Sequence, residues 1–92
     1  MQPPCVYFDG RLYYVRPRLF EKDVGDPSTW NVVGQIVSSC GYENIPTQNG
    51  EINFDISRLI EPVIYMSPDN LLFVHLVENN VSPFRGLEPV EK

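Results

Sequence analysis

The feature that most constrains this fold is an Asp-Gly pair, Asp9-Gly10, set between two runs of aromatic and β-branched residues at 5–8 and 12–15. Gly adopts positive φ at no steric cost and Asp tolerates it, which is what the tight type I′ turn of a β-hairpin requires. Pro17 follows the second run and ends it, because proline cannot donate to a strand ladder. The sequence therefore predicts an antiparallel hairpin near the N-terminus.

Four further stretches have the pattern of strands. Residues 30–39 carry apolar side chains on both faces, with a mid-strand glycine that predicts a bulge or a close backbone approach. Residues 51–56 alternate strictly between polar and apolar, which is typical of a half-buried strand. Residues 63–66 and 71–77 flank a Ser-Pro-Asp-Asn turn and predict a second hairpin, whose return strand we expect to be the most buried.

Composition favours the same fold class, since alanine is absent while the chain has 9 prolines and 6 glycines. We expect helix only as a turn or two, near 27–30 or 57–61. The prediction is an all-β fold, a small antiparallel meander or partly open barrel of about five or six strands. We expect one β domain at residues 1–77 and a C-terminal extension at 78–92 that is partly disordered.

Charge and hydropathy exclude two classes of protein. The chain has 7 basic and 12 acidic residues, a formal charge of −5, and no basic stripe of the kind that nucleic acid requires. No apolar run approaches the roughly 18 residues that span a bilayer. Residues 1–4 lack the basic and apolar regions of a signal peptide, so we expect either a cytosolic protein or one whose export signal precedes Met1.

The cysteine and histidine content excludes a metal centre. With Cys5, Cys40 and His75 alone, one chain cannot supply a four-ligand zinc site, and we expect no metal and no cofactor. Free thiols are ordinary in a cytosolic protein and a disulfide in an exported one, so both states remain open. If the protein is exported we expect the Cys5–Cys40 bridge, which would close a loop of about 35 residues and contribute roughly 3.5–4 kcal/mol.

Catalysis is not indicated. His75 lies in an apolar strand, where a structural role is the expectation, and no serine or cysteine has the setting of a nucleophile. The acidic residues Glu43, Glu51 and Asp55 lack the spacing of a calcium loop, and we expect them to form a solvated surface. The protein is therefore predicted to be non-enzymatic.

The first hairpin and the residues near it concentrate aromatic and arginine side chains. Tyr13 and Tyr14 must point to opposite faces, so one of them lies outside the core. Tyrosine, tryptophan and arginine are enriched at interfaces. We predict a protein-binding surface made of Tyr7, Arg11, Tyr13, Tyr14, Arg16 and Trp30.

The order of short motifs over residues 6–77 resembles a family of small uncharacterised proteins of Gram-positive bacteria that are exported or lipoprotein-like. The shared pieces are Asp-Gly-Arg-Leu-Tyr-Tyr, Val-Gly-Gln-Ile-Val-Ser-Ser, Ile-Pro-Thr-Gln-Asn-Gly and Asn-Phe. The chain departs from the family pattern at Glu51-Ile52 and after Phe54, where the family usually has glycine. The resemblance implies an extracytoplasmic location and no known enzymatic activity.

Two functions follow from these observations. The first is a non-enzymatic extracytoplasmic binding or interaction module with a protein partner. The alternative is a small acidic adaptor or inhibitor, intracellular or phage-encoded, that acts by occluding a protein partner.

Overall fold

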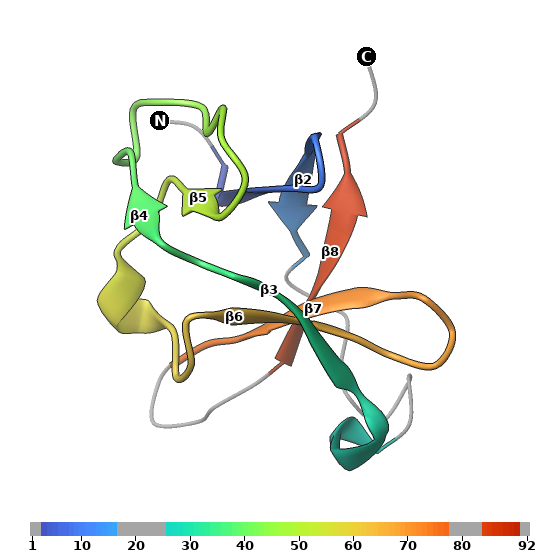
Figure 1. The fold of residues 1–92 in the computed structure, drawn as a ribbon. Coiled ribbons are helices and arrows are strands. Elements are labelled where there is room, and N and C mark those ends of the chain that lie inside the picture. The colour runs from blue at the N-terminus through green and yellow to red at the C-terminus, as the bar shows by residue number, and fades with distance from the viewer. Residues whose placement is uncertain (1–2, 17–25, 78–83, 91–92) are drawn as a thin grey trace.

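The computed structural model describes residues 3–16, 26–77 and 84–90, and these residues form an all-β fold (Figure 1). The strands are β1 (Cys5–Phe8), β2 (Arg11–Val15), β3 (Asn31–Gln35), β4 (Ser38–Ser39), β5 (Glu51–Ile52), β6 (Val63–Met66), β7 (Leu72–His75) and β8 (Phe84–Pro89). Within the described residues, helix is limited to the 3-10 turns η2 (Pro27–Thr29) and η3 (Ile56–Arg58), close to the two predicted places. The fold class is confirmed, whereas the described residues form eight strands rather than five or six.

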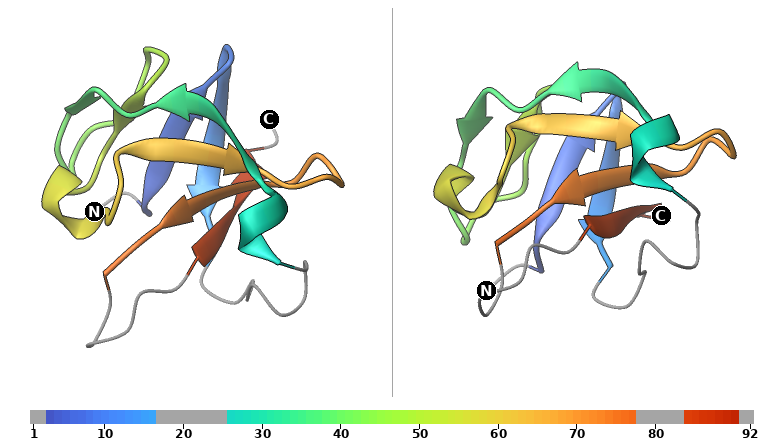
Figure 2. Two further views of the ribbon diagram at one scale, coloured as in Figure 1. Left: turned by 60° about the horizontal axis from the view of Figure 1, so that its bottom comes forward. Right: turned by 90° about the horizontal axis from the view of Figure 1, so that it is seen from below.

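The eight strands form one curled sheet in the order β3-β6-β7-β8-β2-β1-β5-β4 (Figure 2). Neighbours pair antiparallel except β4 and β5, which are parallel. The two ends of this order, β3 and β4, follow each other in the chain. Ile36 N–H donates to the Pro62 carbonyl at 2.7 Å, and Val37 N–H donates to the Gly50 carbonyl at 2.8 Å. The bent segment between β3 and β4 therefore makes hydrogen bonds at both ends of the half-barrel.

Both predicted hairpins are present. In the first, Cys5 pairs with Tyr14 and Phe8 with Arg11, and φ is 54° at Asp9 and 75° at Gly10, as a type I′ turn demands. The second joins β6 to β7 through residues 67–71. Its return strand is shorter than the predicted 71–77, since Leu76 forms only an isolated bridge with Leu59, and Leu71 and Val77 are exposed.

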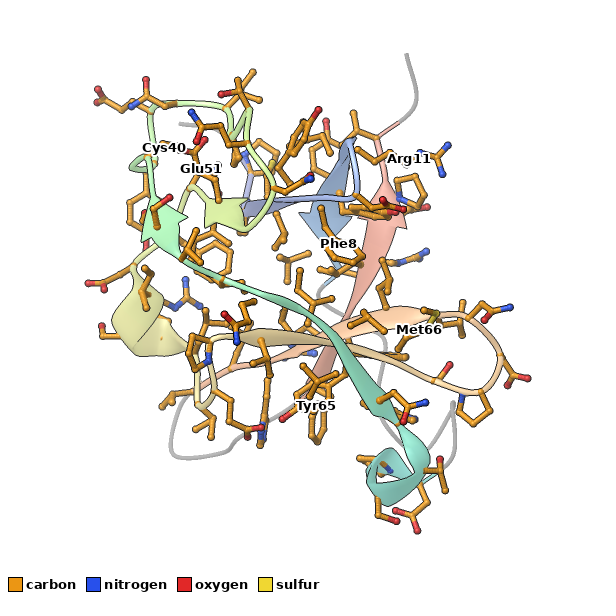
Figure 3. All side chains as sticks on the ribbon, viewed as in Figure 1. Phe8, Arg11, Cys40, Glu51, Tyr65 and Met66 are labelled. Atoms are coloured by element: carbon orange, nitrogen blue, oxygen red, sulfur yellow. The ribbon has the colours of Figure 1, made fainter. Side chains whose placement is uncertain are left out.

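The glycine of the predicted strand at 30–39 has both expected features. The pairing of β3 with β6 shifts register between Val32 and Gly34. A Cβ atom at Gly34 would lie 2.5 Å from a ring carbon of Phe8, whose side chain Figure 3 shows in the interior. Only glycine therefore lets the bulged β3 segment cross this close to β1.

The strand predicted at 51–56 is wrong beyond Ile52, although its alternation correctly indicated that Ile52 and Phe54 are buried. Asn53 is also fully buried. Its side-chain oxygen accepts the Cys5 N–H at 2.7 Å, and its amide donates to the Pro3 carbonyl at 2.9 Å. The Asn53 side chain thus makes hydrogen bonds to the backbone where a longer β5 would make strand pairing, and the chain then continues into η3.

The predicted domain boundary needs a correction at the C-terminus. β8 was placed in an extension, but it lies inside the sheet between β2 and β7. Its register joins Val15 to Leu87 and Val74 to Arg85. Residues 78–83 of the predicted extension lie outside the described residues.

Apolar side chains gather on both faces of the sheet. The inner core is the cluster of Val6, Tyr13, Ile36, Ile52, Phe54, Leu59, Ile64, Val74, Leu76 and Leu87. On the outer face, Trp30, Tyr65, Phe73 and Phe84 form a second group, named here the aromatic cluster. Within the described ranges, no helix is long and apolar enough to cross a membrane.

Candidate functional site

The structure buries some residues of the predicted binding surface and exposes others. Trp30 is 8% exposed, with its ring stacked on Phe73 at 4.2 Å between centroids and edge-on to Phe84 at 4.9 Å. Tyr13 is 9% exposed and belongs to the inner core. Placing these two side chains on an open surface was wrong, because aromatic partners from distant strands bury Trp30 and the inner core buries Tyr13.

The other predicted residues are accessible to different degrees. Tyr14 is 39% exposed, as the opposite faces of neighbouring strand residues require, and Tyr7 is half-buried. Arg11 is exposed at the hairpin turn and lies at the periphery of the molecule (Figure 3). The Arg16 guanidinium pairs with Glu88 at 3.3 Å on the surface.

Cys5 and Cys40 are free thiols. The chain at 52–53 runs between them, since Cys40 N–H donates to the Ile52 carbonyl at 2.8 Å and Asn53 N–H donates to the Cys5 carbonyl at 3.3 Å. Two strand spacings amount to about 10 Å, beyond the Cα separation of a disulfide. Burial is the main cause that raises the pKa of the Cys5 thiol, and the nearby Cys40 raises it further. Burial is also the main cause that raises the pKa of Cys40, and the charge of Glu51 is the second. Both thiols are therefore protonated at neutral pH.

His75 contacts two side chains, Glu61 and Phe84. Its Nδ1 lies 2.9 Å from a carboxylate oxygen of Glu61, and its ring stacks on Phe84 at 4.0 Å between centroids. Glu51 accepts the Thr47 N–H at 2.8 Å, and no group of three or more acidic, histidine or cysteine residues in the described part of the chain could hold a metal. The carboxylates therefore do not converge on a site.

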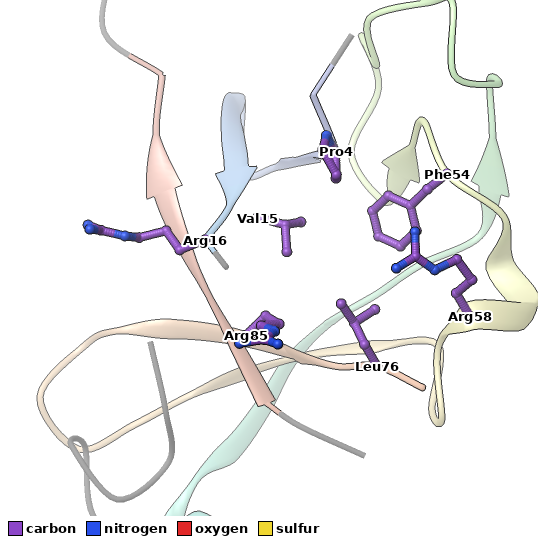
Figure 4. A pocket seen from close by; sticks show the side chains of 7 residues that line it. All are labelled: Pro4, Val15, Arg16, Phe54, Arg58, Leu76 and Arg85. Carbon is purple, nitrogen blue, oxygen red and sulfur yellow. The ribbon is translucent and has the colours of Figure 1, made fainter. Parts of the chain in front are cut away.

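A pocket of about 190 Å³ opens where the curled sheet ends near η3, and it is named here the arginine pocket (Figure 4). It is lined by Pro4, Val15, Arg16, Phe54, Arg58, Leu76 and Arg85. Arg58 points from η3 toward Phe54, whereas the Arg16 guanidinium points away from the centre. The polar groups that face the pocket are therefore those of Arg58 and Arg85.

Strand register places Arg85 on the inner face. Arg85 pairs with Val74, a fully buried core residue, and cross-strand partners share a face. Leu87, two residues on, also belongs to the inner core. An arginine at the end of the same inward row puts a permanent positive charge at the mouth of the half-barrel.

Local hydrogen bonds position Arg58. The Asp55 carboxylate accepts the Ser57 N–H at 2.9 Å, and this bond lowers the pKa of Asp55. Arg58 N–H donates to the Asp55 carbonyl at 3.0 Å, and Val77 N–H donates to the Arg58 carbonyl at 2.7 Å. The Arg58 guanidinium lies 5.9 Å from the centre of the Phe54 ring. Among residues 3–16, 26–77 and 84–90, no carboxylate lies within ion-pair distance of Arg58.

The arrangement suits an anion, and the described residues that line the pocket include no nucleophile. A guanidinium stays charged at all working pH values and presents planar donors that match carboxylate and phosphate oxygens. Apolar groups of Val15, Phe54 and Leu76 line the pocket beside these donors. The mouth of a barrel is also a common place for a ligand.

Sequence reasoning found Arg16 but missed Arg58 and Arg85. Arg58 was assigned to a helical turn with no role, and Arg85 to a tail. The available signal was the alternation Phe84, Arg85, Gly86, Leu87, which reads as a strand with Arg85 on the same face as Leu87. Comparisons with protein-family models, curated proteins and solved structures gave no match for this chain.

Proposed function

We propose that this chain is a non-enzymatic binding module and that the arginine pocket holds a negatively charged group of its partner. The observation that carries the proposal is the convergence of Arg58 from η3 and Arg85 from β8 on one hollow, which Arg16 lines just after the end of β2. The chain has 7 basic against 12 acidic residues, so three of its few cations line a single pocket. An anion bound there would interact favourably with the guanidinium groups of Arg58 and Arg85.

The outer face of the first hairpin extends the proposed contact surface. Arg16 lines the arginine pocket and Tyr14 precedes it on β2, exposed beside Glu88, its partner residue on β8. A tyrosine next to a charged pocket offers apolar area and a hydroxyl, a combination enriched at interfaces. A protein partner would thus place an anionic group in the pocket and pack against Tyr14.

For the location we propose the extracytoplasmic address implied by the family resemblance. The intracellular adaptor is the second candidate, and the burial of Cys5 and its separation from Cys40 by β5 are ordinary for reduced thiols. The test is fractionation of the native host with detection of the chain by mass spectrometry. Recovery in the envelope or the medium supports the extracytoplasmic address, and recovery in the cytosol supports the intracellular one.

Thermal unfolding with added anions tests the binding function. A ligand at about ten times its Kd adds about 1.4 kcal/mol, which is roughly 6–11 °C in Tm for a domain of this size. We expect benzoate to raise the Tm of the wild type and of Arg11→Gln but not of the double variant Arg58→Gln/Arg85→Gln. Neutral benzamide should raise none of them. Equal shifts in the wild type and the double variant would overturn the proposal.

A further inference from the structure

We infer that the ligand of the arginine pocket is a carboxylate carried on a compact apolar body. The inference rests on the proposed function and names the ligand class of the same site. The pocket combines two guanidinium groups with apolar walls, so it offers one charged end and one apolar end. Each part of the inference follows from a separate feature of the pocket.

The charged end is made by Arg58 and Arg85, which come from η3 and β8 and enter the pocket from different sides (Figure 4). A carboxylate has two oxygens with about four lone-pair sites and can bind one planar guanidinium bidentately while accepting from a second. Two arginines from separate segments therefore match one carboxylate.

The remaining donors around the pocket disfavour phosphate. Phosphate sites use backbone N–H groups, helix N-termini and hydroxyls in addition to cations. Here Val15 N–H already donates to the Pro4 carbonyl at 3.0 Å and Arg16 N–H to the Gly86 carbonyl at 2.8 Å. None of the described residues that line the pocket carries a hydroxyl. Among these residues the pocket thus lacks the backbone and hydroxyl donors that phosphate sites add to their cations.

The apolar end sets the size of the ligand. Pro4, Val15, Phe54 and Leu76 supply apolar walls, and the pocket measures about 190 Å³. An apolar cavity of about 150 Å³ holds benzene, so this pocket takes a body of roughly six to ten heavy atoms. Two sources offer such a group, a free small acid or the last residue of a protein chain with an apolar side chain.

Calorimetric titration of the purified chain with acetate, butyrate, hexanoate, phenylacetate and inorganic phosphate tests this inference. Affinity should rise about fourfold for each methylene buried until the pocket is full. Hexanoate and phenylacetate should bind at least tenfold more tightly than phosphate. Arg58→Gln and Arg85→Gln should each lose at least tenfold, Arg85→Lys should lose less than Arg85→Gln, and Arg11→Gln should be unchanged.

Peptides distinguish the two sources. An acetylated Gly-Gly-Phe with a free carboxylate is compared with its C-terminal amide and with phenylacetate. Binding of the acid peptide but not of the amide identifies a chain end as the source, and binding of phenylacetate without the acid peptide identifies a free acid. An amide that binds as tightly as the acid would overturn the inference.

Two outcomes separate this inference from the proposed function. Phosphate binding as tightly as hexanoate, with a flat series from acetate to hexanoate, would overturn the carboxylate inference and leave an anion pocket. If no anion binds, the proposed function fails as well. Because Arg58→Gln and Arg85→Gln alter different segments, a folding defect in one, detected from its Tm, leaves the other as the test.

Discussion

Two neighbouring residues of β8 lead to opposite environments. Phe84 faces the outer side of the sheet, where it packs edge-on against Trp30 and Tyr65 and stacks on His75. Arg85 faces the inner side, where it lines the arginine pocket. One strand thus contributes to a filled aromatic cluster on one face and to an open charged hollow on the other.

The comparison shows why residue type alone does not locate a binding surface. Tryptophan, tyrosine and arginine are all enriched at interfaces. In this fold the aromatic residues find partners within the chain, as the 4.2 Å stacking of Trp30 on Phe73 illustrates. Arg16, Arg58 and Arg85 instead line a pocket of about 190 Å³. Substitutions in the aromatic cluster should therefore affect stability, and substitutions in the arginine pocket should affect binding.

The largest effect is expected for Phe73→Ala, which removes the fully buried ring under Trp30. Truncation of a buried phenylalanine costs about 3–5 kcal/mol through lost transfer energy and a cavity. Urea denaturation measures the change in free energy of unfolding. The exposed Tyr14→Ala should stay within about 0.5 kcal/mol of the wild type.

A loss below about 1 kcal/mol for Phe73→Ala would contradict a packed aromatic cluster. If Phe73→Ala does not fold, Phe73→Leu, which keeps much of the volume, should cost about 1–3 kcal/mol and serves in its place.

Asn53→Ala should rank second, at about 2–4 kcal/mol. It leaves the buried Cys5 N–H without its side-chain partner, which costs about 1–3 kcal/mol, and it removes the hydrogen bond to the carbonyl of the exposed Pro3, which contributes about 1 kcal/mol. The exposed Asn49, which accepts the Gly10 N–H at 2.9 Å, is the matched control and should cost less than about 1 kcal/mol on substitution by Ala. Equal losses at both positions, measured by urea denaturation, would refute a special role for the buried amide.

Unlike Phe73→Ala and Asn53→Ala, Arg85→Gln should affect binding more than stability. We expect a change below about 1 kcal/mol in unfolding free energy and a loss of at least tenfold in affinity for phenylacetate. Denaturation and calorimetry on the same preparation measure both quantities. A variant that loses several kcal/mol of stability yet keeps its affinity would make Arg85 a structural residue and break the comparison.

The smallest effect concerns pH. The Ser57 N–H bond lowers the pKa of Asp55, so the folded state favours the charged carboxylate. Its stabilisation is present above the unfolded pKa of about 3.9 and is lost as pH falls through the lower folded value. The stability difference between the wild type and Asp55→Asn should therefore shrink between pH 5 and pH 2, in urea denaturations across that range.

Asp26, whose pKa is lowered by the equivalent bond from Ser28 N–H, is the matched control remote from the pocket. Asp26→Asn should show the same pH trend without any loss of affinity for phenylacetate, whereas Asp55→Asn should weaken binding slightly because Asp55 positions η3 and Arg58. A difference that grows toward low pH would show that the charged form is not the stabilised one.

Local signals in the sequence were sufficient for both hairpins, for the close approach at Gly34 and for the opposite faces of Tyr13 and Tyr14. Each depends on a few adjacent residues, namely turn dipeptides, alternation or a missing Cβ. The burial of Trp30 depends instead on Phe73 and Phe84, which are more than forty residues away in the chain.

The arginine pocket was missed for a related reason. Its arginines come from η3, from β8 and from the residue after β2, and β8 combines a glycine, two charged residues and a proline that lower its strand propensity. β8 is stabilised by pairing with β2 and β7 on either side, so tertiary context overrides its local preference. The early end of β5 likewise follows from the side-chain bonds that Asn53 makes to residues at the N-terminus.

The most direct test of the central claim is a two-dimensional NMR titration of the labelled chain with phenylacetate. The arginine pocket predicts saturable shifts at the backbone amides of Val15 and Leu76 and at the side-chain Nε–H signals of Arg58 and Arg85, with the Trp30 indole N–H unmoved. Shifts centred on Trp30 and the aromatic cluster, with the pocket signals unchanged, would contradict the account.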